Sequence, residues 1–132
     1  MRWQLSKLEN IFKLVGRLAI SAIFIFAAVG KVMNPSGAMS YIQSAGIPVP
    51  AGLAYAVAVA VEVICGTLLI IGWRTRLSAF VLFLFLVPAT YFFHFDPSSR
   101  IQTVMALKNI AIAGGLFFIM AAGPGRFSLD KG

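Results

Sequence analysis

The sequence predicts an all-α membrane protein: four transmembrane helices in an antiparallel, up-down bundle, with a short N-terminal interfacial helix. The chain has 132 residues, 60% of them hydrophobic, and its mean hydropathy is +0.92. About half of the residues of a soluble globular domain are apolar. The higher apolar content of this chain therefore excludes a soluble domain. Four apolar runs of membrane-spanning length are joined by short polar stretches. Short connections make neighbouring helices antiparallel, which predicts the bundle.

The charge of the chain is positive and thinly spread. Eleven Lys and Arg residues against four Asp and Glu give a formal net charge of +7. The basic residues stand singly beside the apolar runs, which is typical of signals that orient a membrane protein and excludes a nucleic-acid surface. Cys65 is the only cysteine. The sequence therefore offers no internal disulfide, no CxxC pair and no multi-thiolate metal site.

Residues 1–13 predict a cytoplasmic, amphipathic helix that lies in the membrane interface. Apolar side chains recur there at helical spacing, with basic residues between them. The transmembrane domain is expected at 14–122, and its first span at about 14–33. Asn34-Pro35 ends this span, because the residue before a proline is pushed out of the helical region.

A secretory signal peptide is the competing interpretation of this N-terminal region. The start is basic, and Ala28-Val29-Gly30 resembles a cleavage site. Arg17, however, falls inside the stretch that would have to be the apolar region of such a peptide. The sequence therefore favours a transmembrane helix that is retained.

The second span, expected at 53–71, carries one acid near its middle, Glu62. Nineteen residues at about 1.5 Å each cover about 28 Å, the thickness of the hydrocarbon core. Gly72 then ends the helix. The preceding segment, 34–52, is uncharged and rich in proline and glycine, which predicts a loop with a short surface helix around 38–44.

The third span is expected at about 77–94, kinked at Pro88, and the fourth at about 103–122. Residues 123–132 then form a cytoplasmic tail. Basic residues of the N-terminal segment, of the turn after the second span and of the tail fall on one side of the bundle. The positive-inside rule therefore predicts a multi-pass protein of the cytoplasmic (inner) membrane with both termini in the cytoplasm.

Glu62 would lie near the bilayer midplane, where an unpaired carboxylate costs a few kcal/mol. It should therefore face other protein and either find a basic partner or hold a proton. The remaining spans offer four basic or titratable residues: Arg17, Lys31, His94 and Lys108. Arg17 and Lys31 share one face of the first span, about 21 Å apart along its axis.

Six residues are predicted to line a buried polar pocket: Arg17, Lys31, Glu62, His94, Lys108 and Asn109. In the deduced topology, Lys31, His94 and Lys108 lie toward the outer side of the membrane. Glu62 lies centrally and Arg17 toward the cytoplasm. Such a pocket, open outward or to the outer leaflet, could bind a small anion or the head group of a quinone, with Glu62 and His94 exchanging protons.

A structural role is the alternative for the same residues. Glu62 could form an ion pair with Arg17, Lys31 or Lys108 and so fix the register of the helices. Lys31 could extend its ammonium group to the interface. Asn109 could simply bond to a neighbouring helix.

Cys65, close to Glu62 on the same helical face, is expected to be a packing residue. Glu62, Cys65 and His94 match no recurring metal-binding spacing, so no metal site is predicted. The sequence also contains no phosphate loop, nucleophile elbow or haem-ligating histidine pair. It therefore identifies no catalytic residue and no certain cofactor.

Several short sequence motifs follow one another along the chain. The motifs are Arg17 with Phe24, Ala28-Val29-Gly30-Lys31-Val32, Gly46-Ile47-Pro48, Glu62 with Gly66, Leu68-Leu69-Ile70-Ile71-Gly72, Thr75-Arg76, His94 and Gly123-Pro124-Gly125-Arg126-Phe127-Ser128-Leu129-Asp130. Their order and spacing, over nearly the whole chain, resemble the DoxX family of bacterial integral membrane proteins.

This resemblance implies a bacterial inner-membrane location and a redox setting. The family is similar to DoxD and to the small subunits of thiosulfate:quinone oxidoreductase, and some members resemble membrane anchors of thiol or superoxide defence assemblies. We therefore expect a subunit of a quinone-linked or thiol/oxidative-stress redox assembly, more readily a non-catalytic subunit of an oxidoreductase complex than a complete enzyme. A quinone is the candidate ligand, and the lipid bilayer is the surrounding partner.

Two other functions stay open. The chain could be a non-enzymatic scaffold or assembly partner, or a homo-oligomer, that packs through small residues such as Gly114-Gly115. It could also be a small transporter or proton path. That function requires a polar route through the cytoplasmic half, where only Arg17, Ser21 and Thr67 are available.

Overall fold

Five helices make up the described part of the chain. The structure is a computed structural model that describes residues 2–94 and 98–131, with side chains from 5 to 92 and from 98 to 131. In chain order the helices are α1 (Arg2–Met33), α2 (Pro35–Ser44), α3 (Ala51–Ile71), α4 (Thr75–His94) and α5 (Arg100–Ala122).

Four of these helices contain segments long and apolar enough to cross a membrane: Leu5–Met33 of α1, all of α3, Thr75–Phe92 of α4, and all of α5. This finding confirms the predicted all-α fold with four transmembrane helices. Pro88 lies inside α4, as expected. The fourth span begins slightly earlier than predicted, because Ser99 Oγ accepts a hydrogen bond from the backbone N–H of Gln102 and caps the helix.

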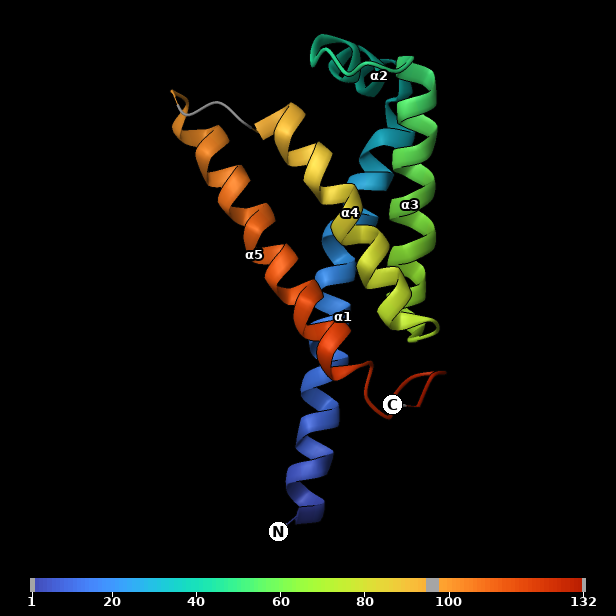
Figure 1. The fold of residues 1–132 in the computed structure, drawn as a ribbon. Helices are drawn as coiled ribbons and strands as arrows, with labels where there is room; N and C mark the ends of the chain where they lie inside the picture. Colours follow the sequence, from blue (N-terminus) through green and yellow to red (C-terminus); the bar gives the residue numbers. More distant parts are fainter. Residues whose placement is uncertain (1, 95–97, 132) are drawn as a thin grey trace.

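The spans run up and down in alternation and enclose a common core (Figure 1). We call the end with both termini and the α3–α4 turn the terminal end, and the opposite end, which carries α2, the α2 end. The most extensive contacts pair α1 with α3 and α4 with α5, and α3 also packs on α4. The α4–α5 pair leans away from α1 and α3 toward the α2 end.

The first helix is longer than a bilayer is thick. Its 32 residues cover about 48 Å, and its N-terminal part projects beyond the other helices at the terminal end (Figure 1). No break separates residues 2–13 from the span, and an interfacial position of the predicted N-terminal helix stays a prediction. Asn34 follows the helix and caps α2 by accepting a hydrogen bond from the Gly37 N–H at 3.2 Å.

Buried apolar side chains gather in the terminal half of the bundle. They come from all four spans: Phe24, Cys65, Leu69, Ala79, Leu82, Leu86, Leu116 and Ile119. Cys65 is part of this core, as expected for a packing residue. A filled terminal half and a leaning α4–α5 pair leave the room for a cavity at the α2 end.

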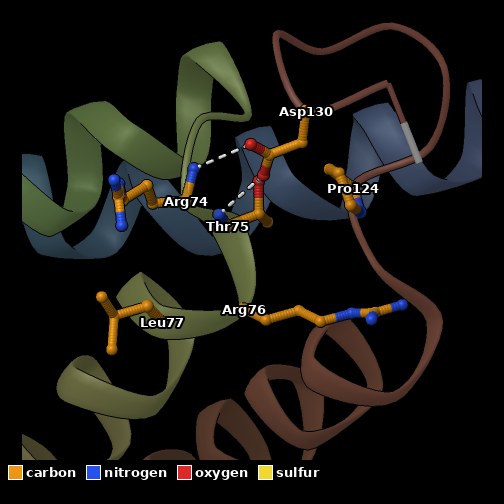
Figure 2. A pocket seen from close by; sticks show the side chains of 6 residues that line it. All are labelled: Arg74, Thr75, Arg76, Leu77, Pro124 and Asp130. Atoms are coloured by element: carbon orange, nitrogen blue, oxygen red, sulfur yellow. Dashed lines mark hydrogen bonds between the residues drawn. The ribbon is translucent and has the colours of Figure 1, made fainter.

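The C-terminal tail folds back onto the α3–α4 turn. The backbone N–H groups of Leu129 and Asp130 donate to the carbonyls of Ile71 and Gly72 at 3.1 and 2.9 Å. The Asp130 carboxylate then accepts hydrogen bonds from the backbone of Arg74 and Thr75 and from Thr75 Oγ1, which caps α4 (Figure 2). We call this arrangement of residues 127–130 on residues 69–75 the C-terminal clasp.

The clasp fixes the protonation of its acid. Partial desolvation alone would raise the pKa of Asp130, but the hydrogen bonds from Thr75 and Arg74 outweigh it, and the net pKa is lowered. Asp130 therefore stays ionised at neutral pH and keeps its place at the positive end of the α4 dipole.

Arg17 joins α1 to the clasp. Its guanidinium is fully buried and donates to the carbonyls of Leu69 and Ile70, in the last turn of α3, at 2.7 and 3.1 Å. A third hydrogen bond reaches the carbonyl of Phe127 in the tail. The last carbonyls of a helix have no intrahelical partner, so Arg17 satisfies groups that lipid could not.

Replacing Gly72 with alanine should lower the midpoint of thermal unfolding in mild detergent. Gly72 ends α3 with a φ of +72°, and an added Cβ would overlap Ser128 and crowd Arg17 Nη1. The left-handed conformation alone costs an L-residue about 1–2 kcal/mol. Gly16→Ala is the matched control, since nothing lies within 4 Å of its added Cβ. Equal midpoints for the two variants would contradict the clasp.

Candidate ligand-binding site

A large cavity lies between the helices at the α2 end. Its volume is about 740 Å³, and all five helices contribute to its wall. Small-molecule sites in proteins have volumes of about 300–1,000 Å³, so the cavity is large enough for a drug-sized ligand. Most of its lining is apolar.

The residues that line the cavity recur at helical spacing on each span. On α1 they include Phe24, Ala27 and Lys31, and on α3 they include Ala58 and Glu62. On α5, Lys108 and Ile112 are one turn apart. One stripe from each helix therefore faces the same space, as positions three to four residues apart on a helix do.

The short helix α2 and the loop after it close the cavity at the α2 end. Tyr41 and Ile42 of α2 line it, together with Ile47 and Val49 of the loop. Ile42 is buried in this contact. The cavity lies where the α4–α5 pair leans away from α1 and α3 (Figure 1), and it is only partly enclosed.

The central polar feature of the cavity is an ion pair between Lys31 and Glu62. Lys31 Nζ lies 2.8 Å from Glu62 Oε1, and the Glu62 side chain is 4% exposed. The Tyr55 hydroxyl donates to the carbonyl of Lys31 at 3.1 Å and so ties the last turn of α1 to α3. A carboxylate buried this deeply would be strongly destabilising without its cation.

The α5 wall carries two further polar residues. Asn109 is buried, and its Nδ2 donates to Thr90 Oγ1 on α4 at 3.0 Å. Its side-chain oxygen has no hydrogen bond within the described ranges that would occupy it. Lys108 is an exposed residue that lines the cavity, and its ammonium group has no hydrogen bond or ion pair in the described part of the chain.

The structure brings four of the six predicted site residues together at this cavity: Lys31, Glu62, Lys108 and Asn109. Arg17 is not among them, because its guanidinium is held by the C-terminal clasp at the terminal end. His94 ends α4, but its side chain lies outside the described residues. The proton exchange between Glu62 and His94 stays a prediction.

Three residues of the site were not anticipated from the sequence. Tyr55 is seven residues before Glu62, and this spacing places both on one face of the helix. The sequence spacing could therefore have indicated Tyr55 as a neighbour of the site. Thr90 pairs with Asn109 across two helices, and Tyr41 belongs to the closing helix. Both of these placements depend on how α2 and the α4–α5 pair pack, which local sequence does not reveal.

A metal ion has no evident place in the part of the chain that the structure describes. No three His, Cys, Asp or Glu residues there lie close enough to hold one. Glu62 is committed to Lys31, and Cys65 is packed in the core. The polar side chains of the described cavity lining are therefore an ammonium–carboxylate pair, a second ammonium group, the amides of Asn34 and Asn109 and the phenol of Tyr41.

A second, smaller cavity of about 290 Å³ lies beside the C-terminal clasp. Arg74 and Arg76 line it, but their guanidinium groups point in opposite directions (Figure 2). The Arg74 guanidinium lies 5.6 Å from the ring centre of Trp73. These two cations therefore do not converge on a shared anion, and the cavity at the α2 end is the stronger candidate.

Comparisons with known proteins agree with this architecture. The model of the family described as DoxX matches residues 12–95. Inner membrane protein YqjF of Escherichia coli (strain K12) is 28% identical, with 96% of this chain and 95% of the relative covered. Inner membrane protein YphA of the same organism is 33% identical, with 92% and 89% covered. Uncharacterized membrane protein Rv3486 of Mycobacterium tuberculosis (strain ATCC 25618 / H37Rv) is 29% identical, with 87% and 77% covered. No solved structure matches significantly.

Proposed function

The chain belongs to the DoxX family and is a multi-pass inner-membrane protein, and from this premise we propose that it binds a quinone-like, membrane-soluble molecule in the cavity at the α2 end. It would do so as a subunit of a redox-associated assembly. The observation that carries the proposal is the Lys31–Glu62 pair, set in the wall of an otherwise apolar cavity of about 740 Å³.

The chemistry of the wall suits a flat ring with oxygen substituents and an apolar tail. The carbonyl oxygens of a quinone only accept hydrogen bonds, and the ammonium groups of Lys31 and Lys108 are donors that face the cavity. Glu62 keeps Lys31 in position and offers a carboxylate that can exchange a proton with the ring oxygens. Aromatic and aliphatic side chains, among them Phe85 and Phe92, would surround the tail.

Access from the bilayer supports a membrane-soluble ligand over a water-soluble one. Residues of α2 and of the loop after it line the cavity at the α2 end, and the cavity is only partly enclosed by the described side chains. An apolar molecule already dissolved in the membrane would therefore enter sideways, without crossing the interface. The electrons for any redox step would come from a partner in the assembly, and the role of this chain would be to bind and orient the ring.

We propose that both termini lie in the cytoplasm. The terminal end carries most of the basic residues: Lys7, Lys13, Arg74, Arg76, Arg126 and Lys131. Outside the cavity, the α2 end carries Arg100. Lysine and arginine favour the cytoplasmic side of short loops, so this asymmetry supports a cavity in the outer half of the membrane.

Glu62→Gln should weaken binding of decylubiquinone at least tenfold in phosphatidylcholine nanodiscs, as measured by isothermal titration. The amide cannot hold Lys31 by charge, so its ammonium group would turn from the cavity to the interface. Glu9→Gln is the matched control, because Glu9 also pairs with a lysine, Lys13 at 3.0 Å, but outside the cavity.

Circular dichroism and gel filtration would show whether both of these variants stay folded. Unchanged affinity in a folded Glu62→Gln protein would count against the proposed site. Loss of folding in that variant alone would instead assign the pair a structural role.

Fusions to reporter proteins would test the orientation. Alkaline phosphatase, which is active only outside the cytoplasm, should be inactive when fused after Lys131 and active when fused after Ser44, at the end of α2. A green fluorescent protein should give the opposite pattern. An active phosphatase at the C-terminus would place the cavity in the inner half of the membrane and refute the orientation.

A further inference from the structure

We infer that the head group bound in this cavity is an anion and that Lys108 is its counter-ion, so that the ligand is an amphipathic oxyanion. The inference rests on the proposed function and narrows it, because a quinone-like ring can be neutral or acidic. It is based on the net charge of the described cavity wall, on the position of Lys108 along α5, and on the partners that Arg17 and Lys31 have within the protein.

The described wall of the cavity has one positive charge in excess. Three of its residues are charged: Lys31, Glu62 and Lys108. Lys31 and Glu62 neutralise each other at 2.8 Å. Lys108 lies on another helix and has no ion pair or hydrogen bond within the described ranges. An anionic ligand would neutralise the charge of Lys108, whereas a neutral ligand would leave that charge without a counter-ion.

Lys108 lies too deep for its charge to be explained by the membrane interface. It is eight residues after Arg100, where α5 begins, and so about 12 Å along the helix. A lysine side chain reaches roughly 6 Å, so even an extended one leaves its ammonium group below the end of the helix. Hydrocarbon offers no counter-ion at that depth, and an uncompensated charge there is costly.

The chain gives its other two membrane-embedded cations protein partners, although Arg17 Nε is buried without a hydrogen bond in the described part of the chain. Arg17 donates to three carbonyls at the C-terminal clasp, and Lys31 has Glu62. Lys31 and Lys108 both line the cavity, but of these three cations only Lys108 has no hydrogen bond or ion pair within the described ranges. The sequence therefore satisfies buried cations internally where it can, and the bare ammonium group at the cavity marks a place for an external anion.

The surroundings of Lys108 show how the ligand would lie. Asn109, next in the chain, is fixed by Thr90 and lines the same cavity. Ile112, one turn deeper on α5, and Phe85 and Leu86 on α4 are apolar. A charged head group at Lys108 would therefore direct an alkyl tail toward these apolar side chains.

Two matched pairs of probes test the inference in phosphatidylcholine nanodiscs. One pair is 2-hydroxy-3-undecyl-1,4-naphthoquinone, which is ionised at neutral pH, and its neutral methyl ether. The other is dodecanoate and methyl dodecanoate. We expect the anion of at least one pair to bind at least tenfold more tightly than its neutral partner. If only the naphthoquinone pair shows tighter binding of the anion, the head group of the ligand is an acidic ring. If both pairs show it, the site binds long-chain oxyanions in general.

Lys108→Gln should remove this preference by weakening the anion at least tenfold while leaving the neutral partner unchanged. Lys131→Gln, at an exposed lysine of the tail, is the matched control and should keep the preference. If the neutral partner of each pair binds as tightly as its anion and Lys108→Gln changes neither affinity, the anion inference is wrong and the proposed function stands. If no probe binds, and decylubiquinone does not bind either, the proposed function itself is refuted.

Discussion

The ion pair between Lys31 and Glu62 is the contact on which the α2 half of the bundle depends. Glu62 sits midway along a helix that is otherwise almost entirely apolar, so its carboxylate must be neutralised by protein. Lys31 reaches it from the last turn of α1, and Tyr55 holds that turn to α3. The pair thereby fixes the rotation of α1 against α3 and places two charges in the wall of an apolar cavity.

The two ends of the bundle differ in how their helices pack and in how their polar groups are satisfied. At the terminal end, Arg17 and Asp130 satisfy the exposed backbone groups of α3 and α4, and the core there is filled. At the α2 end the helix pairs lean apart, and α2 covers the resulting space without filling it. A tight terminal end can hold the four spans together while the α2 end keeps room for a ligand.

Much of this architecture could be predicted from the sequence, because membrane thickness and the cost of buried charge constrain it strongly. Hydropathy located the four spans, Gly72 marked the end of α3, and the depth of Glu62 required an internal cation. The role of Arg17 could not be predicted, because it depends on the tail folding back over more than a hundred residues. The cavity could not be predicted either, since its apolar lining looks the same in sequence as a lipid-facing surface.

Thermal unfolding of charge-reversal variants in nanodiscs tests the central claim most directly. Lys31→Glu and Glu62→Lys each place two like charges together in a buried site, so each should lower the unfolding midpoint clearly. The double variant restores an opposite pair, and it should recover most of the loss if the two side chains touch as described. Single variants that unfold like the original chain, or a double variant whose loss is the sum of the two, would contradict the account.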